Sequence, residues 1–438
     1  MPAAGDPIAF LYSLETLGMK FGLENITALC AAMGHPEHTF RSVIVGGTNG
    51  KGSVAAIVSA ALHGAGYRSA RYTSPHLERL EERFVVAQQE VTSGHLRAAA
   101  SRVQDTVLAM LDDGAIEVPP TFFECTTAVA FELFKRAGVE IAVLEVGLGG
   151  RLDATNVVTP LVAAITSIDI DHAAQLGHTI AEVAWEKAGI IKPEVPVVLG
   201  PVPPDAERVI TDVARQRNAR VIRIGTDVVL ESRTESGRTT VGIASSRRRL
   251  NEVVLGLSGR HQASNAATAT AVLDALGDRG FPVDDPAARR ALMNPEWPGR
   301  LERFSHRACE VLLDAAHNPA GARALAAYLR EAGWQPVTLL FGVMRDKDIA
   351  GMLDALLPVC EAVIATTAPS ARAAAASEIV AIVEGARQRP RIVEAVDRPD
   401  AALARACELG NRVVAAGSLF LIGPLRGILR NLQPRTST

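Results

Sequence analysis

The sequence predicts an α/β protein with a mostly parallel sheet and a second, smaller α/β unit. Short apolar runs recur along the chain, glycine follows them, and a helical pattern comes next. The run Ser42–Val45 precedes a glycine-rich loop and the helical stretch Ser53–Ala65. Phe122–Ala137 has a helical pattern and leads into the run Ile141–Val146, and Leu161–Ile168 is another buried-strand candidate. This alternation is typical of parallel strands with helices on both faces of the sheet.

The pattern changes between Val221 and Leu257. The runs VIRI, VVLE, TTVGI and EVVLGL are short and are separated by charged residues and by Gly237. This spacing predicts antiparallel strands, and His261–Leu276 then returns to an alanine-rich helical pattern.

A break at Asn294–Arg300 separates the two predicted units. Its sequence, NPEWPGR, contains two prolines and a glycine, which interrupt helices. Beyond it, further strand candidates alternate with helices: Val311–Asp314, Val337–Phe341, Ala362–Thr366 and Arg412–Ala416. We therefore expect one domain over residues 1–297 and a smaller one over residues 298–438.

The composition excludes several classes of protein. Lys and Arg total 45 against 48 Asp and Glu, so a net charge of -3 gives no footprint for nucleic acid or anionic lipid. The five cysteines lack CxxC spacing, which argues against a disulfide framework or zinc site and fits a reducing cytoplasm. The start of the chain does not resemble a signal peptide, and no apolar stretch is long enough to span a bilayer. We expect a cytoplasmic monomer.

The segment RSVIVGGTNGKGSV reads as strand, glycine-rich loop and helix. This order turns backbone N–H groups and a helix N-terminus toward a phosphate chain. Lys51 would place a charge between the β- and γ-phosphates, and Ser53, or less favourably Thr48, would supply a hydroxyl near a metal. Gly46 and Gly50 stand one residue closer than in the general P-loop. The competing interpretation is a glycine-rich turn, but the Lys-Gly-Ser context favours ATP binding.

Glu145 ends an apolar run, where a carboxylate faces the crevice at the carboxyl ends of the strands. One such carboxylate is enough for Mg²⁺, which keeps several waters. The alternative is an ordinary acid at a strand end. His172 follows another apolar run, and its spacing alone favours a structural role because histidine is an unusual magnesium ligand. Asp171 would then cap the helix that follows.

Lys187 lies on an apolar helical face in IAEVAWEKAGIIKP. A lysine in that position is expected to extend to solvent, although a partly buried amine would be open to modification or loss of its proton. Arg300 follows the proline-glycine break and is either a phosphate clamp or a surface arginine. In LLDAAHNPAG, Asp314 at a strand end would accept ribose hydroxyls or cap a helix, and His317 lies in the following turn.

Together these segments resemble the folylpolyglutamate synthase/dihydrofolate synthase family of the Mur ligase superfamily. The resemblance runs in order along nearly the whole chain: LGMKFGLENITALCAAMGHP, GGTNGKGS, YTSPHL, TFFE, EVGLGGRLDATN, DHAAQLGHTIAEVAWEKAGIIKP, GRHQASNAATA, WPGRLE, LDAAHNPAG, FGVMRDKD and AAGSLFLIG. GGTNGKGS is the family's P-loop variant, which accounts for the short spacing. Ala315, Leu80 and Glu81 depart from common family patterns. The fold implied is a P-loop central domain and a Rossmann-like C-terminal domain.

The resemblance implies a role for each matching residue. Lys51, Lys187 and His317 would be catalytic, with Lys187 carbamylated to support a second metal ion. The ATP-binding residues would be Thr48, Asn49, Gly50, Lys51, Gly52, Ser53, Asn265, Arg300 and Asp314. The Mg²⁺ ligands would be Ser74, Glu145 and His172. The pteroate pocket would be formed by Gly22, Thr121, Phe122, Phe123, Glu124, Leu152, Asp153 and Ala154. His317 and Ser418 would bind the incoming L-glutamate.

The reaction implied is ATP-dependent addition of L-glutamate to dihydropteroate and to folates such as tetrahydrofolate, through an acyl phosphate. The second domain would close, because water would hydrolyse an exposed acyl phosphate. A monofunctional folylpolyglutamate synthase is the alternative within the family. A cell-wall ligase is disfavoured because the loop at Gly46 leaves little chain for a UDP-binding domain. An ATP-gated binding protein is the alternative from a different class.

Overall fold

The computed structural model describes residues 5–18, 22–306 and 308–432, which divide into two compact units. The first contains the described residues up to Leu230 together with Gly242–Asn251 and Ser264–Pro295. The second contains Glu231–Val241, Glu252–Ala263 and the described residues from Glu296 onward. The chain thus passes between the units more than once. The division into domains over residues 1–297 and 298–438 remains a prediction.

The first unit is built on an eight-stranded sheet in the order β4-β3-β2-β5-β1-β6-β7-β8. Its strands are β1 (Arg41–Gly46), β2 (Ser69–Tyr72), β3 (Phe84–Val86), β4 (Gln89–Glu90), β5 (Ile141–Glu145), β6 (Val162–Ile165), β7 (Val197–Leu199) and β8 (Val221–Arg223). All neighbours pair in parallel except β2 with β3 and β3 with β4. The mostly parallel sheet predicted from the sequence is confirmed.

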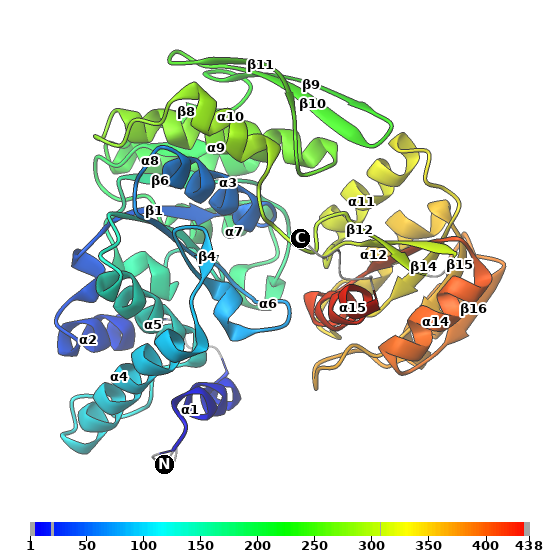
Figure 1. The fold of residues 1–438 in the computed structure, drawn as a ribbon, viewed down its shortest axis with the longest axis horizontal. Coiled ribbons are helices and arrows are strands. Elements are labelled where there is room, and N and C mark those ends of the chain that lie inside the picture. The colour runs from blue at the N-terminus through cyan, green and yellow to red at the C-terminus, as the bar shows by residue number, and fades with distance from the viewer. Residues whose placement is uncertain (1–4, 19–21, 307, 433–438) are drawn as a thin grey trace. The chain divides into compact units, whose positions relative to one another are not determined.

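Helices cover both faces of this sheet (Figure 1). They are α1 (Pro7–Ser13), α2 (Glu24–Ala32), α3 (Lys51–Gly64), α4 (Ser93–Asp112), α5 (Phe122–Arg136), α6 (Ala173–Leu176), α7 (Ile180–Ala188), α8 (Pro204–Gln216), α9 (Arg260–Gly277) and α10 (Asp285–Met293). The first turn of α9, before Ser264, belongs to the second unit. Short 3₁₀ turns complete the unit: η1 (Leu14–Leu17), η2 (Pro36–His38), η3 (Leu80–Arg83) and η4 (Ala154–Val157). Buried side chains of α1, α2, α4 and α5 pack on Ala142 and Leu144, whereas those of α7 and α8 pack on Ile44 and Ala163.

Strand order places the glycine loop at the point where the order of the strands in the sheet reverses. β1 lies between β5 and β6, so the chain leaves β1 toward one side of the sheet and later returns to fill the other. In parallel α/β sheets, ligands bind beyond the carboxyl ends of the strands where this reversal occurs. The loop after β1 and Glu145 at the end of β5 both lie there, because Val45 pairs with Glu145.

A three-stranded sheet in the order β11-β10-β9 follows β8. It consists of β9 (Val229–Glu235), β10 (Arg238–Ala244) and β11 (Arg249–Val254). Ser236 and Gly237 join β9 to β10 with φ angles of 50° and 78°, the backbone of a tight antiparallel hairpin. The expected antiparallel stretch is therefore present, but its first predicted run was assigned wrongly. VIRI contributes β8, which pairs in parallel with β7 at the edge of the main sheet, where its three residues are only partly buried.

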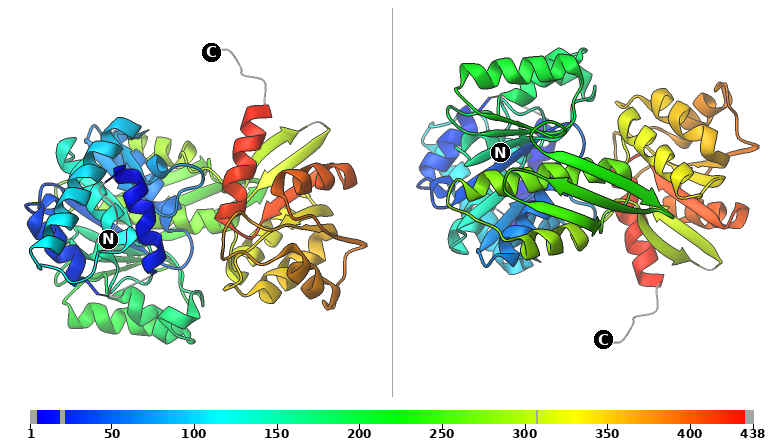
Figure 2. Two further views of the ribbon diagram at one scale, coloured as in Figure 1. Left: turned by 90° about the horizontal axis from the view of Figure 1, so that it is seen from below. Right: turned by 90° about the horizontal axis from the view of Figure 1, so that it is seen from above.

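The second unit contains a six-stranded sheet in the order β12-β13-β17-β14-β15-β16, drawn yellow to red in Figures 1 and 2. Its strands are β12 (Glu302–His306), β13 (Cys309–Leu313), β14 (Val337–Phe341), β15 (Cys360–Ala365), β16 (Ile392–Ala395) and β17 (Arg412–Ala416). Only β12 is antiparallel to its neighbour. Around the sheet lie α11 (Pro319–Glu331), α12 (Ile349–Leu356), η5 (Leu357–Val359), α13 (Ala376–Glu384), α14 (Pro399–Leu409) and α15 (Leu419–Leu432).

Helices pack on both faces of this second sheet (Figure 2). Leu339 and Phe341 of β14 join a buried cluster with α11, α12 and α13, whereas α14 and α15 contact β14, β15, β12 and β17. β17 is inserted between β13 and β14, so the segments that follow β13 and β17 emerge side by side. These are the segments that carry Asp314, His317 and Ser418.

Candidate functional site

The glycine loop, Gly46–Ser53, joins β1 directly to α3. Gly50 is the residue before the helix and has a φ angle of 88°, a conformation that favours glycine. A Cβ atom on Gly50 would lie 2.2 Å from Oδ1 of Asn265, so the side chain of this predicted ATP contact packs directly against the loop. The backbone N–H groups at the start of α3 have no partners within the helix and suit a phosphate group.

Two hydroxyl side chains that follow β6 hold the loop in shape. Thr166 Oγ1 donates a hydrogen bond of 2.6 Å to the carbonyl oxygen of Asn49, and Ser167 Oγ donates another of 3.0 Å to the same atom. A Cβ atom on Gly47 would lie 2.1 Å from Thr166 Oγ1, which requires glycine there. Sequence reasoning missed both hydroxyl residues, although their position directly after a buried strand beside β1 was an available signal.

Thr48 also helps to frame the loop. Its hydroxyl donates to the carbonyl oxygen of Asp169 and accepts from the Asp169 N–H, both at 3.0 Å. Ser53 lies in the first turn of α3 and its side chain is buried. Of the two predicted hydroxyl groups, that of Thr48 is therefore engaged with the chain itself, which favours Ser53 as the hydroxyl near a metal.

Lys51 and Lys187 converge on one carbonyl group. Lys51 Nζ donates to the carbonyl oxygens of Gly47 and Thr48, each at 3.1 Å. Lys187 Nζ donates to the same oxygen of Gly47 at 2.9 Å. The expectation that Lys187 extends to solvent is wrong, because only 4% of the residue is exposed and its amine reaches the loop from α7.

The surroundings of Lys187 favour the neutral form of its amine. Burial, together with the neighbouring charge of Lys51, lowers the pKa of its amine to about 7, against the opposing effects of Asp171 and Asp153. A substantial fraction of the amine is therefore neutral near pH 7. A neutral amine is a nucleophile, unlike an ammonium group.

Ser74 and Glu145 lie together at the ends of adjacent strands. The Ser74 N–H donates to Glu145 Oε2 at 3.2 Å, and Glu145 is 5% exposed. His172 precedes α6 with a left-handed φ angle of 53°, and its Nε2 atom lies 3.9 Å from Asp171 Oδ1. The Asp171 carboxylate accepts the His172 N–H, so its predicted role as cap of α6 is wrong: the residue before the helix is His172. The carboxylate and hydroxyl oxygens offer the donor chemistry that Mg²⁺ prefers.

The TFFE segment begins α5 with a reciprocal cap. Thr121 and Glu124 each accept a hydrogen bond from the other's backbone N–H, at 3.2 and 2.8 Å, so both polar groups hold the helix end. The Phe122 ring stacks on Tyr12 with centroids 5.8 Å apart, and the Arg83 guanidinium lies 5.2 Å from the centre of the same ring. Phe123 packs against Gly147, where a Cβ atom would lie 2.6 Å from its ring.

Asp153 fixes the glycine-rich turn that faces this segment. Its Oδ2 atom accepts the N–H groups of Gly147 and Leu148 at 3.0 and 2.9 Å, and its Oδ1 atom accepts from Thr155. Burial raises the pKa of the Asp153 carboxyl, and the hydrogen bonds act against that shift. TFFE and LDA, far apart in sequence, thus meet at Gly147. Leu152 is half-buried and Ala154 is buried.

Gly22, the remaining predicted pteroate residue, has a φ angle of 146° and lies just before α2. Residues 19–21, which belong to the same predicted segment, lie outside the described residues.

In the second unit, Arg300, Asp314, His317 and Ser418 form what we call the strand-end cluster. Asp314 accepts the N–H groups of Leu301 and Ala316 at 3.0 and 2.9 Å, which fixes the segment after Arg300 against the end of β13. Burial raises the pKa of the Asp314 carboxyl, and Arg300 opposes that shift. The suggested helix cap at Asp314 is wrong, because Asn318 caps α11 by accepting the Gly321 N–H.

His317 and Ser418 lie on neighbouring segments. The Gly417 N–H donates to the carbonyl oxygen of Ala316 at 2.9 Å, and Ser418 is buried at the start of α15. His317 Nδ1 lies 2.9 Å from the Ala315 carbonyl oxygen. Because a carbonyl oxygen only accepts, Nδ1 carries the proton and Nε2 of the neutral ring is an acceptor.

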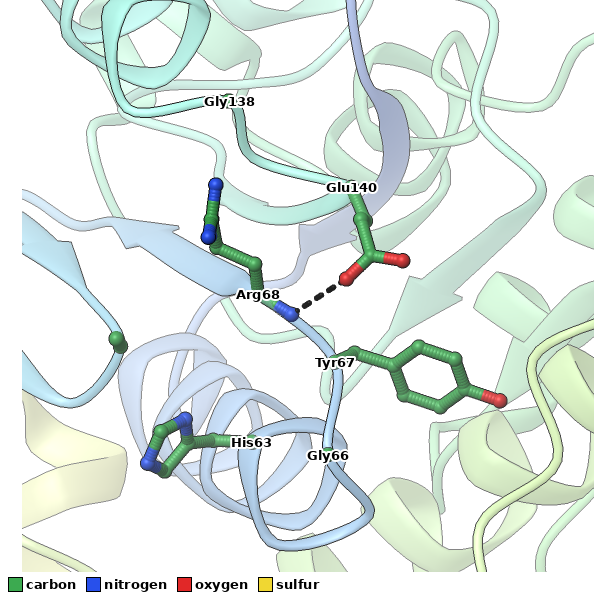
Figure 3. A pocket seen from close by; sticks show the side chains of 7 residues that line it. His63, Gly66, Tyr67, Arg68, Gly138 and Glu140 are labelled. Atoms are coloured by element: carbon green, nitrogen blue, oxygen red, sulfur yellow. Dashed lines mark hydrogen bonds between the residues drawn. The ribbon is translucent and has the colours of Figure 1, made fainter.

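A surface recess of about 500 Å³ lies elsewhere on the first unit and is lined by His63, Gly66, Tyr67, Arg68, Ala87, Gly138 and Glu140 (Figure 3). It lies beyond the C-terminal end of α3, whereas the glycine loop is at the N-terminal end of that 14-residue helix. A helix of this length spans roughly 20 Å. The Glu140 carboxylate accepts the Arg68 N–H there, at the amino ends of β2 and β5. This recess is not part of the candidate site.

Among the described residues, no helix is long and apolar enough to cross a membrane.

Comparison with protein families matches two segments of the chain. Residues 45–273 match the Mur ligase middle domain, and residues 299–419 match the glutamate ligase domain of Mur ligases. The folylpolyglutamate synthase of Lacticaseibacillus casei is 31% identical over 432 residues, which are 97% of this chain and 98% of that protein. The dihydrofolate synthase/folylpolyglutamate synthase of Mycobacterium tuberculosis is 37% identical over 384 residues, 84% of this chain and 78% of that protein.

Comparison with solved structures indicates the same family. Folylpolyglutamate synthase of M. tuberculosis, complexed with ADP and AMPPCP, superimposes with a TM-score of 0.89 at 34% identity, covering 97% of this chain and 99% of that one. Escherichia coli FolC in complex with DHPP and ADP gives a TM-score of 0.87 at 29% identity, covering 98% and 99%. A bifunctional folylpolyglutamate synthase/dihydrofolate synthase with Mn, AMPPNP and L-glutamate bound gives 0.83 at 30%, also covering 98% and 99%. This chain therefore belongs to the folylpolyglutamate synthase/dihydrofolate synthase family of Mur ligases.

Proposed function

We propose that this protein is an ATP-dependent ligase that adds L-glutamate to dihydropteroate and to folates. The observation that carries the proposal is the glycine loop, where two lysine amines meet at the Gly47 carbonyl beside a helix N-terminus. The relatives bound to ADP, to ATP analogues, to Mn and to L-glutamate support this reading. The first unit would bind the folate and the phosphates of ATP, and the second would bind glutamate.

The first step of the proposed reaction is phosphoryl transfer. A carboxylate oxygen of the acceptor attacks the γ-phosphorus of ATP, and ADP leaves, giving an acyl phosphate. Lys51 would move from the carbonyl groups of Gly47 and Thr48 to the phosphates and neutralise developing charge. The nucleotide would also contact the loop backbone, Asn265, Arg300 and Asp314. Glu145, Ser74 and His172 would hold Mg²⁺, which contributes charge stabilisation when bound.

In the second step, the amine of L-glutamate attacks the acyl carbon and phosphate leaves. The nitrogen must lose a proton as the amide forms. His317 Nε2 is suited to take it, because Nδ1 is held as a donor by the Ala315 carbonyl. Ser418 on the adjacent segment would help to position glutamate. The pteroate ring would bind at the junction of the TFFE and LDA segments, where Phe122 and Phe123 provide aromatic surface.

We also propose that Lys187 is carbamylated. Its neutral amine would attack the carbon of CO₂, and loss of one proton would leave a carbamate with negative charge. That group would relieve the repulsion between Lys187 and Lys51 and supply oxygen donors for a second metal ion. Addition of ¹³C-labelled bicarbonate should give a carbamate carbon signal by NMR in the wild-type protein and none in Lys187→Arg. Equal signals in the two proteins would rule out carbamylation at this residue.

The bifunctional reading rests on the TFFE and LDA segments and on relatives of both names. A monofunctional folylpolyglutamate synthase is the second candidate. ADP release should be measured with glutamate and, in turn, dihydropteroate, tetrahydrofolate and a UDP-linked muramoyl peptide precursor. Turnover with the first two supports the bifunctional enzyme, and turnover with tetrahydrofolate alone shows the monofunctional one. Turnover with the UDP-linked substrate alone, or nucleotide binding without glutamate-dependent turnover, would overturn the proposed function.

A further inference from the structure

Three metal-binding side chains cluster outside the candidate site, on the segment between α2 and β1. They are His35, Glu37 and His38, and their ligand atoms all lie within 4.8 Å of one another. His35 Nδ1 is 2.8 Å from Glu37 Oε1, and His38 Nε2 is 3.5 Å from the same oxygen. The two imidazole rings stack with their centroids 4.8 Å apart. None of the residues proposed above for catalysis or substrate binding belongs to this cluster.

The backbone of the cluster is fixed by local bonds. After α2, the His35 N–H returns to the Cys30 carbonyl at 2.8 Å, and His35 takes a left-handed φ angle of 53°. Pro36 then begins the short turn η2, and Thr39 closes it by donating its hydroxyl to the Pro36 carbonyl at 2.7 Å. A histidine in a left-handed conformation is strained unless its surroundings hold it there. These bonds fix the backbone that carries both imidazoles.

The charge balance of the cluster is unusual. The Glu37 side chain is only 3% exposed, whereas those of His35 and His38 are 48% and 70% exposed. Glu37 Oε2 is buried and makes no hydrogen bond within the described residues. Burial, then the Glu37 charge and a hydrogen bond to Glu37, raise the pKa of the Cys30 thiol and keep it neutral. A neutral S–H is a weak donor and brings no positive charge to the carboxylate. A buried carboxylate with an unsatisfied oxygen is costly unless a cation joins it.

The donors match a zinc-class ion better than magnesium. Two imidazole nitrogens and one carboxylate oxygen are the ligand set of open, three-ligand zinc sites, whereas Mg²⁺ requires mostly oxygen donors. Ligand atoms of a tetrahedral zinc ion lie about 3.3 Å apart, given Zn–N and Zn–O bonds of about 2 Å. The distances from Glu37 Oε1 to His35 Nδ1 and to His38 Nε2, 2.8 and 3.5 Å, lie on either side of that value. The stacked rings must turn so that their lone pairs converge, which the exposed His38 can do by side-chain rotation.

We propose that His35, Glu37 and His38 form a Zn²⁺ site, with a water molecule in the fourth position. The ion would neutralise the buried carboxylate and tie the end of α2 to the start of β1. The site is separate from the magnesium ligands proposed for catalysis.

Zinc bound by the full-length protein should be measured by equilibrium dialysis with metal analysis, in the presence of excess Mg²⁺ and ADP. The variants are His38→Ala, which leaves the His35–Glu37 bond intact, and the double variant His35→Ala/His38→Ala. The control is His63→Ala, which removes an exposed histidine from α3. Circular dichroism checks that each variant is folded. Cobalt added in place of zinc gives an absorption spectrum that reports coordination directly.

The expected result is one more zinc ion per chain in the wild type and His63→Ala than in the double variant, with affinity in His38→Ala reduced by more than about tenfold. The cobalt spectrum and a zinc-dependent rise in Tm should be lost in the same variants. Equal zinc content in the wild type and the folded double variant would overturn the proposal, as would a cobalt spectrum unchanged by both histidine substitutions. The residues proposed for catalysis are not part of this site. Ligase activity measured without zinc therefore tests the proposed function and not the zinc site.

Discussion

The glycine loop of the first unit and the strand-end cluster of the second occupy the same place in their sheets but are built differently. Both follow parallel strands at their carboxyl ends. Side-chain hydroxyls of Thr166 and Ser167 hold the loop, which gathers two amines at one carbonyl. In the cluster, the Asp314 carboxylate accepts two backbone N–H groups, and the imidazole of His317 lies three residues further along the chain.

The difference indicates that the two regions have different roles in the reaction. Concentrated positive charge beside a helix N-terminus suits a group that gains negative charge during reaction, such as a transferring phosphoryl group. In the cluster, an imidazole whose Nε2 atom can accept a proton instead suits the deprotonation of an amine. Substitutions in the loop should therefore change the chemical step, and those of His317 and Ser418 in the cluster should change the use of glutamate.

The largest effect is expected for Lys51→Ala. Loss of the charge that meets the phosphates should lower glutamate-dependent ADP release on the order of 10³-fold. The matched control is Lys135→Ala, which removes an exposed lysine from α5 and should leave the rate unchanged. Steady-state kinetics with saturating substrates gives the comparison. Near-normal kcat in a folded Lys51→Ala protein would remove the loop from the chemical step.

Lys187→Met should change how stability depends on pH. With a folded pKa of about 7 against an ordinary value of 10.5, the folded state binds fewer protons than the unfolded state between these values. Stability must therefore rise with pH in this window, by up to about 1.4 kcal/mol per pH unit relative to Lys187→Met. Urea unfolding from pH 7 to 9 in CO₂-free buffer measures the difference. Parallel curves for wild type and variant would show that burial does not perturb this amine, and Lys135→Met should keep the wild-type slope.

His317→Ala should affect glutamate more than ATP. If Nε2 accepts a hydrogen bond or proton from the amine, its removal should raise KM for glutamate about tenfold, the typical cost of one hydrogen bond to a charged group. KM for ATP should stay close to the wild-type value. Initial rates at varied glutamate and at varied ATP separate the two constants. A variant in which ATP use alone is impaired would reverse the division drawn between the two regions.

The smallest effect is expected for Thr166→Val. The change preserves shape but removes the 2.6 Å bond to the Asn49 carbonyl, which keeps its bond from Ser167. Loss of about 1 kcal/mol should weaken ADP binding about fivefold without unfolding the protein. Calorimetric titration with ADP measures this. Thr270→Val is the control, because within the described residues that hydroxyl donates to the Ala266 carbonyl of its own helix. Equal affinities in both variants would argue that Thr166 does not shape the loop.

Much of the fold was predictable because periodicity reports local structure. The runs that became β1, β5, β14 and β17 were placed within a residue or two, since each is apolar and bounded by glycine or charge. The short edge strands were not: β8 was assigned to the wrong sheet, because three half-buried residues carry no signal of their partner.

The candidate site was predictable in its residue types but not in its contacts. The motif around Lys51 indicated phosphate binding, yet nothing in the local sequence shows that Lys187 reaches the same carbonyl across 140 residues. Its apolar helical face predicted a solvent-exposed amine, and tertiary packing overrode that expectation. Thr166 and Ser167 were missed because hydroxyl residues after a strand are common, and only the pairing of β6 with β1 brings them to the loop.

The central claim is glutamate ligation through an acyl phosphate. It is tested most directly by following an oxygen atom of the acceptor carboxylate into the released phosphate. Dihydropteroate labelled with ¹⁸O in its carboxylate should be converted with ATP and L-glutamate, and the released phosphate analysed by mass spectrometry. Attack by the carboxylate on the γ-phosphorus predicts one ¹⁸O atom in each phosphate formed, in step with amide product. Unlabelled phosphate alongside amide product would contradict the account.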